Sequence, residues 1–195
     1  MRSGFYRSVA VFRNEGLSAG ASLAHCHSQI LATDYVPELL LERHRRSGQH
    51  RQITGRCLVM DLLAAEQRDG QRIIELNDDL AIWCPFAART AWHVRLLLPG
   101  ACSFGLVNDS LLCVLAEAVR RVARLLEGAI GAGFPFNLTL VQPRLDAPSA
   151  FPWFMDLTPR LTRQAGWELL SDIDVVPVAP EHCAKRLREL LCAGR

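Results

Sequence analysis

Two histidines and a glutamine alternate in the stretch His25-Cys26-His27-Ser28-Gln29. In an extended chain, successive side chains point to opposite faces, so His25, His27 and Gln29 would share one face. A histidine on this face could be a nucleophile for a phosphoryl group, a general acid or base near neutral pH, or a metal ligand. The plainer alternative is a strand that carries two structural histidines.

A loop of small residues precedes the histidines. It contains Gly16, Gly20 and Ser22, and it follows Asn14. Glycine lacks a Cβ and tolerates unusual backbone angles, so such a loop can bring backbone N–H groups close to an anion. The combination of loop and histidines predicts a phosphate beside an imidazole, and it weakens the purely structural alternative.

The order and spacing of these motifs resemble the active-site segment of galactose-1-phosphate uridylyltransferases, a branch of the histidine-triad superfamily. The resemblance lies in three pieces: Phe12-Arg13-Asn14-Glu15-Gly16, Ala19-Gly20-Ala21-Ser22-Leu23 and His25-Cys26-His27-Ser28-Gln29-Ile30. Two later phrases, 84–89 and 159–169, are also similar to the family, so the likeness covers nearly the whole chain. One departure is Cys26, where the family most often has proline.

The resemblance implies an enzyme of galactose metabolism with two half-reactions. His27 would attack the α-phosphorus of UDP-glucose, release glucose 1-phosphate and carry the uridylyl group to galactose 1-phosphate. Gln29 would hydrogen-bond the transferring phosphoryl oxygens. The resemblance assigns the substrate contacts as follows: Asn14 to the nucleotide, Gly20 and Ser22 to the phosphate, Glu168 to hexose hydroxyls, with Trp167 beside it.

The resemblance also bears on metals. His25 matches a zinc-binding position, but the remaining ligands would lie outside this chain, so a structural zinc at His25 is an open expectation and no other cofactor is implied. Family members usually carry His-Trp-His where this chain has Pro152-Trp153-Phe154. We therefore expect a second metal site to be absent. His93 and His182 are expected at the surface or at a strand edge.

Composition narrows the class of protein. The chain has 195 residues, half of them hydrophobic, and a net charge of +2, which gives no reason to expect a nucleic acid or an anionic membrane as partner. Its seven cysteines are scattered without a C-x-x-C pair, and no signal peptide or apolar run of membrane-spanning length stands out. We expect a cytoplasmic protein whose partners are a nucleotide sugar and a hexose 1-phosphate. Because family members typically form dimers, a homodimer is also an expectation.

The periodicity of apolar residues predicts an α+β fold, with antiparallel strands and helices packed on them. Strands are predicted by short alternating or apolar runs at 5–12, 72–76, 80–86, 92–98, 136–141 and 153–158. Helices are predicted by longer amphipathic stretches at 37–52, 57–68, 109–130 and 180–192. The resemblance implies that histidine-triad-like sheets make up both parts of the chain: residues 1–55 as the C-terminal part of a first, catalytic lobe and 56–195 as a complete second lobe.

Two other functions remain open. The chain could be a related nucleoside-diphosphate-sugar phosphorylase or adenylyltransferase, because base and acceptor choice depend on pocket walls that the sequence does not fix. It could also be a truncated, inactive remnant, since the front strands of the first lobe would precede Met1.

Overall fold

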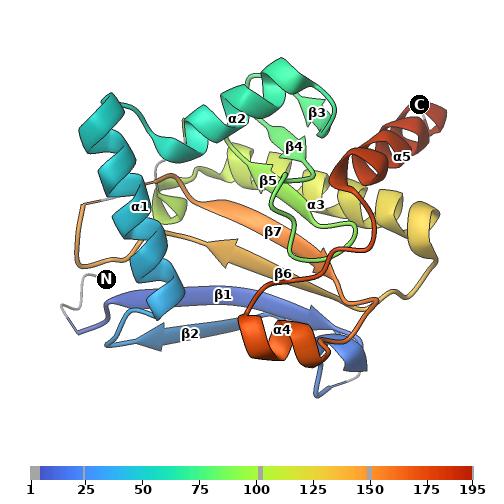
Figure 1. The fold of residues 1–195 in the computed structure, drawn as a ribbon, viewed down its shortest axis with the longest axis horizontal. Coiled ribbons are helices and arrows are strands. Elements are labelled where there is room, and N and C mark those ends of the chain that lie inside the picture. Colours follow the sequence, from blue (N-terminus) through green and yellow to red (C-terminus); the bar gives the residue numbers. More distant parts are fainter. Residues whose placement is uncertain (1–4, 24, 101–102, 149–150, 195) are drawn as a thin grey trace.

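A computed structural model describes residues 5–23, 25–100, 103–148 and 151–194, and it contains a seven-stranded antiparallel sheet (Figure 1). The strands lie in the order β2-β1-β6-β7-β5-β4-β3. Their bounds are β1 Ser8–Glu15, β2 Gln29–Thr33, β3 Ile73–Leu76, β4 Ala81–Trp83, β5 Val94–Leu97, β6 Phe136–Val141 and β7 Phe154–Pro159. Because β1 pairs with β6, the segments 1–55 and 56–195 contribute to one continuous sheet.

Five α-helices and two short 3₁₀ turns accompany the sheet in the described residues. The helices are α1 Glu38–Thr54, α2 Leu58–Asp69, α3 Asp109–Ile130, α4 Gly166–Ser171 and α5 Pro180–Ala193, and the turns are η1 Leu17–Ala19 and η2 Phe104–Leu106. The helix α3 begins where the Asn108 side chain accepts a hydrogen bond from the Leu111 N–H at 2.9 Å, which satisfies one free donor of the first turn. None of these helices is both long and apolar enough to cross a membrane.

The two faces of the sheet are covered by different helices (Figure 1). On one face, α3 buries Leu115, Ala118, Val122 and Leu126, which recur at helical spacing and form one core cluster with α5 and with inward-facing strand residues. On the other face, α2 packs its Val59 and Leu63 against a smaller cluster that includes β4, β5 and β7. The remaining part of this second face, over β1 and β6, stays open between α1 and α4.

The expected fold class is confirmed. Helix α3 and strand β6 have the predicted bounds, whereas the first strand lies at Ser8–Glu15 and not at 5–12. Helix α4 was not predicted, because six residues give too short a periodic pattern. The prediction that His93 is a surface or strand-edge residue is wrong, since its side chain is 1% exposed in the core.

The extended stretch expected around the histidines is also shorter than predicted. Strand β2 begins only at Gln29, and residues 25–28 have no regular structure. Its pairing partner β1 ends at Glu15, because Gly16 turns away with φ of 80°. In this register a residue at position 25 would pair with position 16. Because position 16 lies outside β1, the pairing of the two strands cannot extend to His25.

A buried carboxylate links β5 and β7. Asp156 accepts two hydrogen bonds from Arg95, at 2.7 and 2.8 Å, and the His93 Nε2 lies 3.2 Å from its Oδ1. Burial alone would raise the pKa of Asp156, but the charge and hydrogen bonds of Arg95, with a contribution from His93, outweigh burial and hold the pKa well below its usual range. The carboxylate therefore stays ionised inside the fold.

We expect Arg95→Met to reduce the free energy of unfolding by about 3–5 kcal/mol at pH 7, because it leaves Asp156 charged, buried and without its main partner. The difference in the free energy of unfolding between wild type and variant should shrink as the pH falls toward about 4. In the variant, buried Asp156 can become protonated in this range, whereas in the wild type Arg95 keeps it ionised. Urea denaturation across this pH range measures both effects. The matched control is Arg121→Met, whose partner Glu75 lies in a more exposed pair, and it should cost less than about 1 kcal/mol. Equal losses in the two variants would contradict this account.

A second prediction concerns the turn after β1. A Cβ on Gly16 would lie 3.0 Å from the Pro135 Cβ and its φ is positive, whereas Gly20 has a positive φ but no atom within 4 Å of such a Cβ. Gly20→Ala should therefore lose only the backbone term, about 1–2 kcal/mol, and Gly16→Ala should lose clearly more. Thermal or urea unfolding of the two variants gives the difference, and a smaller loss at Gly16 would show that the contact with Pro135 relaxes freely.

Candidate active site

The His27 ring has defined partners on both of its nitrogens. Its Nδ1 lies 3.0 Å from the backbone oxygen of His25, and its Nε2 lies 3.3 Å from the side-chain nitrogen of Gln29. A carbonyl oxygen can only accept, so this contact assigns the proton to Nδ1 and leaves the lone pair on Nε2. A neutral imidazole with an oriented lone pair is the form that can attack phosphorus.

The sheet register connects His27 to the rest of the molecule. Gln29 pairs with Phe12, so the same register continued by two residues would set position 27 opposite Asn14. Asn14 pairs in turn with Asn137, and Asn137 with Thr158. The row of paired residues Asn14, Asn137 and Thr158 thus crosses from β1 through β6 to β7 on the face that α3 does not cover. Gln29 of β2, which contacts His27, lies on the same face.

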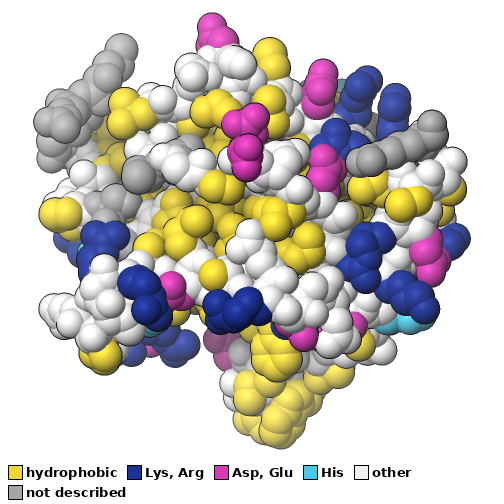
Figure 2. All heavy atoms as spheres, turned by 90° about the horizontal axis from the view of Figure 1, so that it is seen from above, with side chains coloured by type: hydrophobic (Ala, Val, Ile, Leu, Met, Phe, Trp, Pro, Cys, Tyr) yellow, Lys and Arg dark blue, Asp and Glu magenta, His cyan; other side chains and the backbone are white. Residues whose placement is uncertain are grey.

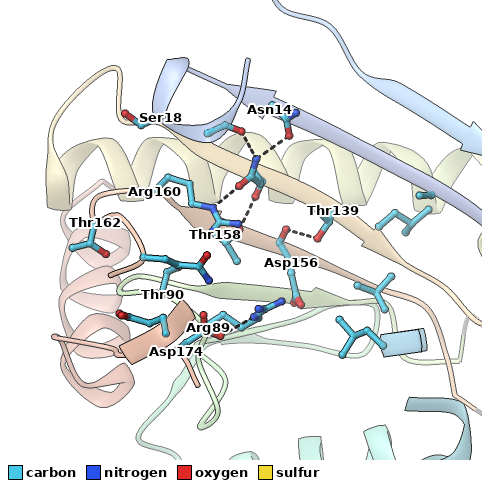
Figure 3. Close-up of a pocket in the computed structure, with 18 of the residues that line it drawn as sticks. Asn14, Ser18, Arg89, Thr90, Thr139, Asp156, Thr158, Arg160, Thr162 and Asp174 are labelled. Carbon is cyan, nitrogen blue, oxygen red and sulfur yellow. Dashed lines mark hydrogen bonds and ion pairs between the residues drawn. The ribbon is translucent and has the colours of Figure 1, made fainter. Parts of the chain in front are cut away.

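A polar pocket of about 760 Å³ opens on this face (Figure 3). In Figure 3, Asn14 and Arg160 lie on one side of it, and Arg89 and Asp174 lie on the opposite side. Its charged lining residues are Arg43, Arg89, Arg160, Arg163, Asp156, Glu168 and Asp174. The uncharged polar ones are Asn14, Ser18, Thr90, Asn137, Thr139, Gln142, Thr158, Thr162 and Gln164. A pocket with this lining suits a ligand that carries hydroxyl and phosphate groups.

The pocket brings together only some of the residues singled out from the sequence. Asn14 and Glu168 line it, while His27 and Gln29 lie at the neighbouring end of the same sheet face. Ser22 is exposed outside the pocket, and Trp167 is 56% exposed on α4. The Gly20 N–H already donates to the Leu17 oxygen at 3.0 Å within the turn, so its contact with a phosphate stays a prediction.

The three carboxylates of the pocket are already engaged. Asp156 pairs with Arg95, Asp174 accepts from Arg89 at 2.9 Å, and Glu168 accepts from the Ala165 N–H at 3.0 Å at the start of α4. By contrast, no carboxylate in the described residues lies within ion-pair distance of Arg43, Arg160 or Arg163. The pocket therefore presents free positive charge, which favours an anionic ligand.

The residues around His25 do not form a complete zinc site in the described part of the chain. His25 is exposed, and its ring centroid lies 5.6 Å from that of His27, whose nitrogens have the contacts given above. No group of three histidine, cysteine or acidic side chains suited to a metal occurs among the described residues. Because structural zinc needs four ligands, His25 alone cannot hold the ion.

Phe154 occupies the position where the resemblance implies a metal-binding histidine. Two guanidinium groups lie against its ring, that of Arg95 at 4.0 Å from the centroid and that of Arg43 at 5.6 Å. Arg43 belongs to α1, so its cation–π contact connects helix and sheet, whereas the contact of Arg95 connects the strands β5 and β7.

Sequence reasoning missed Asn137, Asp156 and Arg160. A signal was present in β6, where Asn137 and Thr139 alternate with Leu138 and Leu140, as expected for a strand with one polar, ligand-facing side. Arg160 gives no such signal, because its position depends on contacts between strands that are far apart in the sequence.

Comparisons with known proteins identify relatives of this chain. No protein-family model matches the chain. A galactose-1-phosphate uridylyltransferase of Neurospora crassa is 30% identical over 210 residues, which cover 96% of this chain and 50% of the relative. An ADP-glucose phosphorylase of Arabidopsis thaliana is 27% identical over 191 residues, covering 93% of this chain and 52% of the relative.

Solved structures give the same result for the fold. The crystal structure of a galactose-1-phosphate-uridylyltransferase-like protein from Arabidopsis thaliana superimposes with a TM-score of 0.85 at 25% identity, covering 95% of this chain and 62% of that chain. The family expected from the sequence is thus confirmed: this chain is a relative of the galactose-1-phosphate uridylyltransferases and spans about half the length of the curated relatives that it matches.

Proposed function

We propose that the chain is a nucleotidyltransferase that moves a nucleoside monophosphate from a nucleotide sugar to a sugar 1-phosphate through His27. The observation that carries the proposal is the oriented Nε2 of His27, which faces the Gln29 amide while Nδ1 is held by a backbone carbonyl. In the first half-reaction Nε2 bonds to the α-phosphorus of UDP-glucose and the bond to the bridging oxygen breaks, which releases glucose 1-phosphate. In the second, a phosphate oxygen of galactose 1-phosphate displaces Nε2 and takes the uridylyl group.

Gln29 has a separate role in this scheme. Its side-chain N–H groups lie next to the attacking nitrogen, so they can donate to the phosphoryl oxygens on which negative charge increases during transfer. In the tautomer with the proton on Nδ1, Nε2 carries a lone pair, so its attack on phosphorus needs no further base.

A second candidate is a phosphorylase that uses inorganic phosphate as the acceptor and an ADP-sugar as the donor. It is favoured by the ADP-glucose phosphorylase relative, which aligns over 93% of this chain. The two candidates share the His27 step and differ only in base and acceptor.

We further expect a homodimer. A run of apolar side chains on and after α4 is exposed, and Figure 2 shows hydrophobic side chains projecting at the lower edge of that view. The run consists of Trp167, Leu169, Leu170, Ile173 and Val175. Contiguous exposed apolar surface of this kind is typical of protein contacts.

The proposal predicts a covalent intermediate. After incubation with UDP-glucose, intact mass spectrometry should show the wild type gaining one UMP and His27→Ala gaining none. His182→Ala, which removes an exposed histidine of α5, is the matched control and should form the adduct normally. An adduct from ADP-glucose but not UDP-glucose would favour the phosphorylase, and no adduct from either donor would contradict both candidates.

Gln29→Ala should slow formation of this adduct by about 100- to 1,000-fold, the range for removing one donor to a developing oxyanion, with little change in the affinity for the donor substrate. Single-turnover kinetics followed by quenched mass measurement separates rate from affinity. A loss of affinity at unchanged rate would show instead that Gln29 binds the ground state.

A further inference from the structure

Arg160 is fixed at both its backbone and its side chain, although it lies at the surface. It follows the end of β7, where its N–H donates to the Pro135 oxygen at 2.8 Å. Its Nε donates to the Asn137 Oδ1 at 2.6 Å. The terminal nitrogens of the guanidinium, at the edge of the pocket, have no hydrogen-bond partner among the described residues (Figure 3).

The contact with Arg160 determines how the Asn137 amide is oriented. Arginine has donors and no acceptor, so it must face the oxygen of the amide. The Asn137 nitrogen is then directed to the Asn14 Oδ1 and the Ala19 backbone oxygen, each at 2.8 Å. All hydrogen-bonding groups of this amide side chain are satisfied, and a flipped amide would bring two donors together.

The same chain of bonds orients Asn14. Its Oδ1 accepts from Asn137, so its own NH₂ group points away from that bond and has no acceptor among the described residues. Arg160 and Asn14 therefore present only donors to the pocket. Since the pocket carboxylates are engaged elsewhere, these donors favour an anionic ligand.

This cluster lies on the same face of the sheet as Gln29, which contacts His27. Asn137 is two strands away from β2, and neighbouring strands are about 4.8 Å apart, so it lies about 10 Å across the sheet from the line of β2. Arg160 follows β7, one strand further from β2, but its side chain reaches back to Asn137 on β6. A phosphate bound by Arg160 would thus belong to the same ligand as the phosphorus that His27 attacks.

We propose that Arg160 binds a phosphate of the nucleotide sugar or sugar phosphate, and that Asn137 is a positioning residue that sets both Arg160 and Asn14 toward it. The choice of ligand rests on the proposed function. The geometry itself requires only a phosphorylated ligand.

Binding of UDP measured by isothermal titration calorimetry tests the inference without turnover. Arg160→Gln should weaken UDP binding by about 10- to 100-fold, the loss expected for a hydrogen bond to a charged group, and should change the binding of uridine, which has no phosphate, by less than about twofold. Arg160→Lys should restore part of the affinity, since it keeps the charge. Arg68→Gln, an exposed arginine of α2, should bind UDP like the wild type.

Asn137→Asp separates positioning from folding. A carboxylate can still accept from Arg160, but it cancels the arginine charge and cannot donate to Asn14 or Ala19. UDP binding should weaken at least tenfold while uridine binding and the circular dichroism spectrum stay close to wild type. Equal loss of UDP and uridine binding would assign Asn137 a merely structural role and overturn the proposal.

Other outcomes are also decisive. Unchanged UDP affinity in Arg160→Gln, or no UDP binding by the wild type, would overturn the inference. UDP binding that depends on Arg160, without a UMP adduct on His27, would keep the inference and remove the proposed function. An adduct that forms normally, with UDP affinity unchanged in Arg160→Gln, would keep the proposed function and overturn the inference about Arg160.

Discussion

The antiparallel pairing of β1 with β6 is the interaction on which the rest of the arrangement depends. It joins the segment that carries His27 to strands more than a hundred residues later, in the register Asn14 to Asn137. Because a shift of one residue would turn every side chain to the opposite face, this register decides whether Asn14 and Asn137 face the pocket or α3. It is held by apolar side chains on the covered face, where Leu138 and Leu140 pack with the α3 core, and by the Asn14–Asn137 hydrogen bond on the open face.

The open face is polar, yet its charges are distributed unevenly. Each of its carboxylates has a fixed role: Asp156 pairs with Arg95 between β5 and β7, Asp174 pairs with Arg89, and Glu168 begins α4. These contacts stabilise the walls, and the two arginines neutralise Asp156 and Asp174 in place. The positive charge left over at Arg160 follows from this division, and a phosphate is the ligand that it fits.

Much of the fold could be predicted from the sequence, because α3 and β6 have strong local patterns that agree with their final packing. The prediction was less accurate for the segment that contains His25 and His27. Its alternation correctly set Gln29 beside His27, but the strand was predicted too far forward, since the end of the ladder depends on Gly16 leaving β1. His93 was misassigned for a related reason: its burial comes from the pairing of β5 with β7, which no local pattern reveals. The roles of Asn137 and Arg160 likewise exist only after distant strands pair.

Phe154 stands where the resemblance implies a metal-binding histidine, and it connects α1 to the sheet without a metal. A histidine at this position could coordinate a metal ion, whereas phenylalanine offers only its ring. Here Arg43 from α1 and Arg95 from β5 both lie against that ring, and Arg95 is held there by Asp156. A cation–π contact contributes about 0.5–2 kcal/mol, more when it is shielded from water, so the Arg43 contact helps to hold α1 on the sheet, while the Arg95 contact and its ion pair with Asp156 join β5 to β7. Because α1 is the first helix after β2, this junction also anchors the strand that carries Gln29.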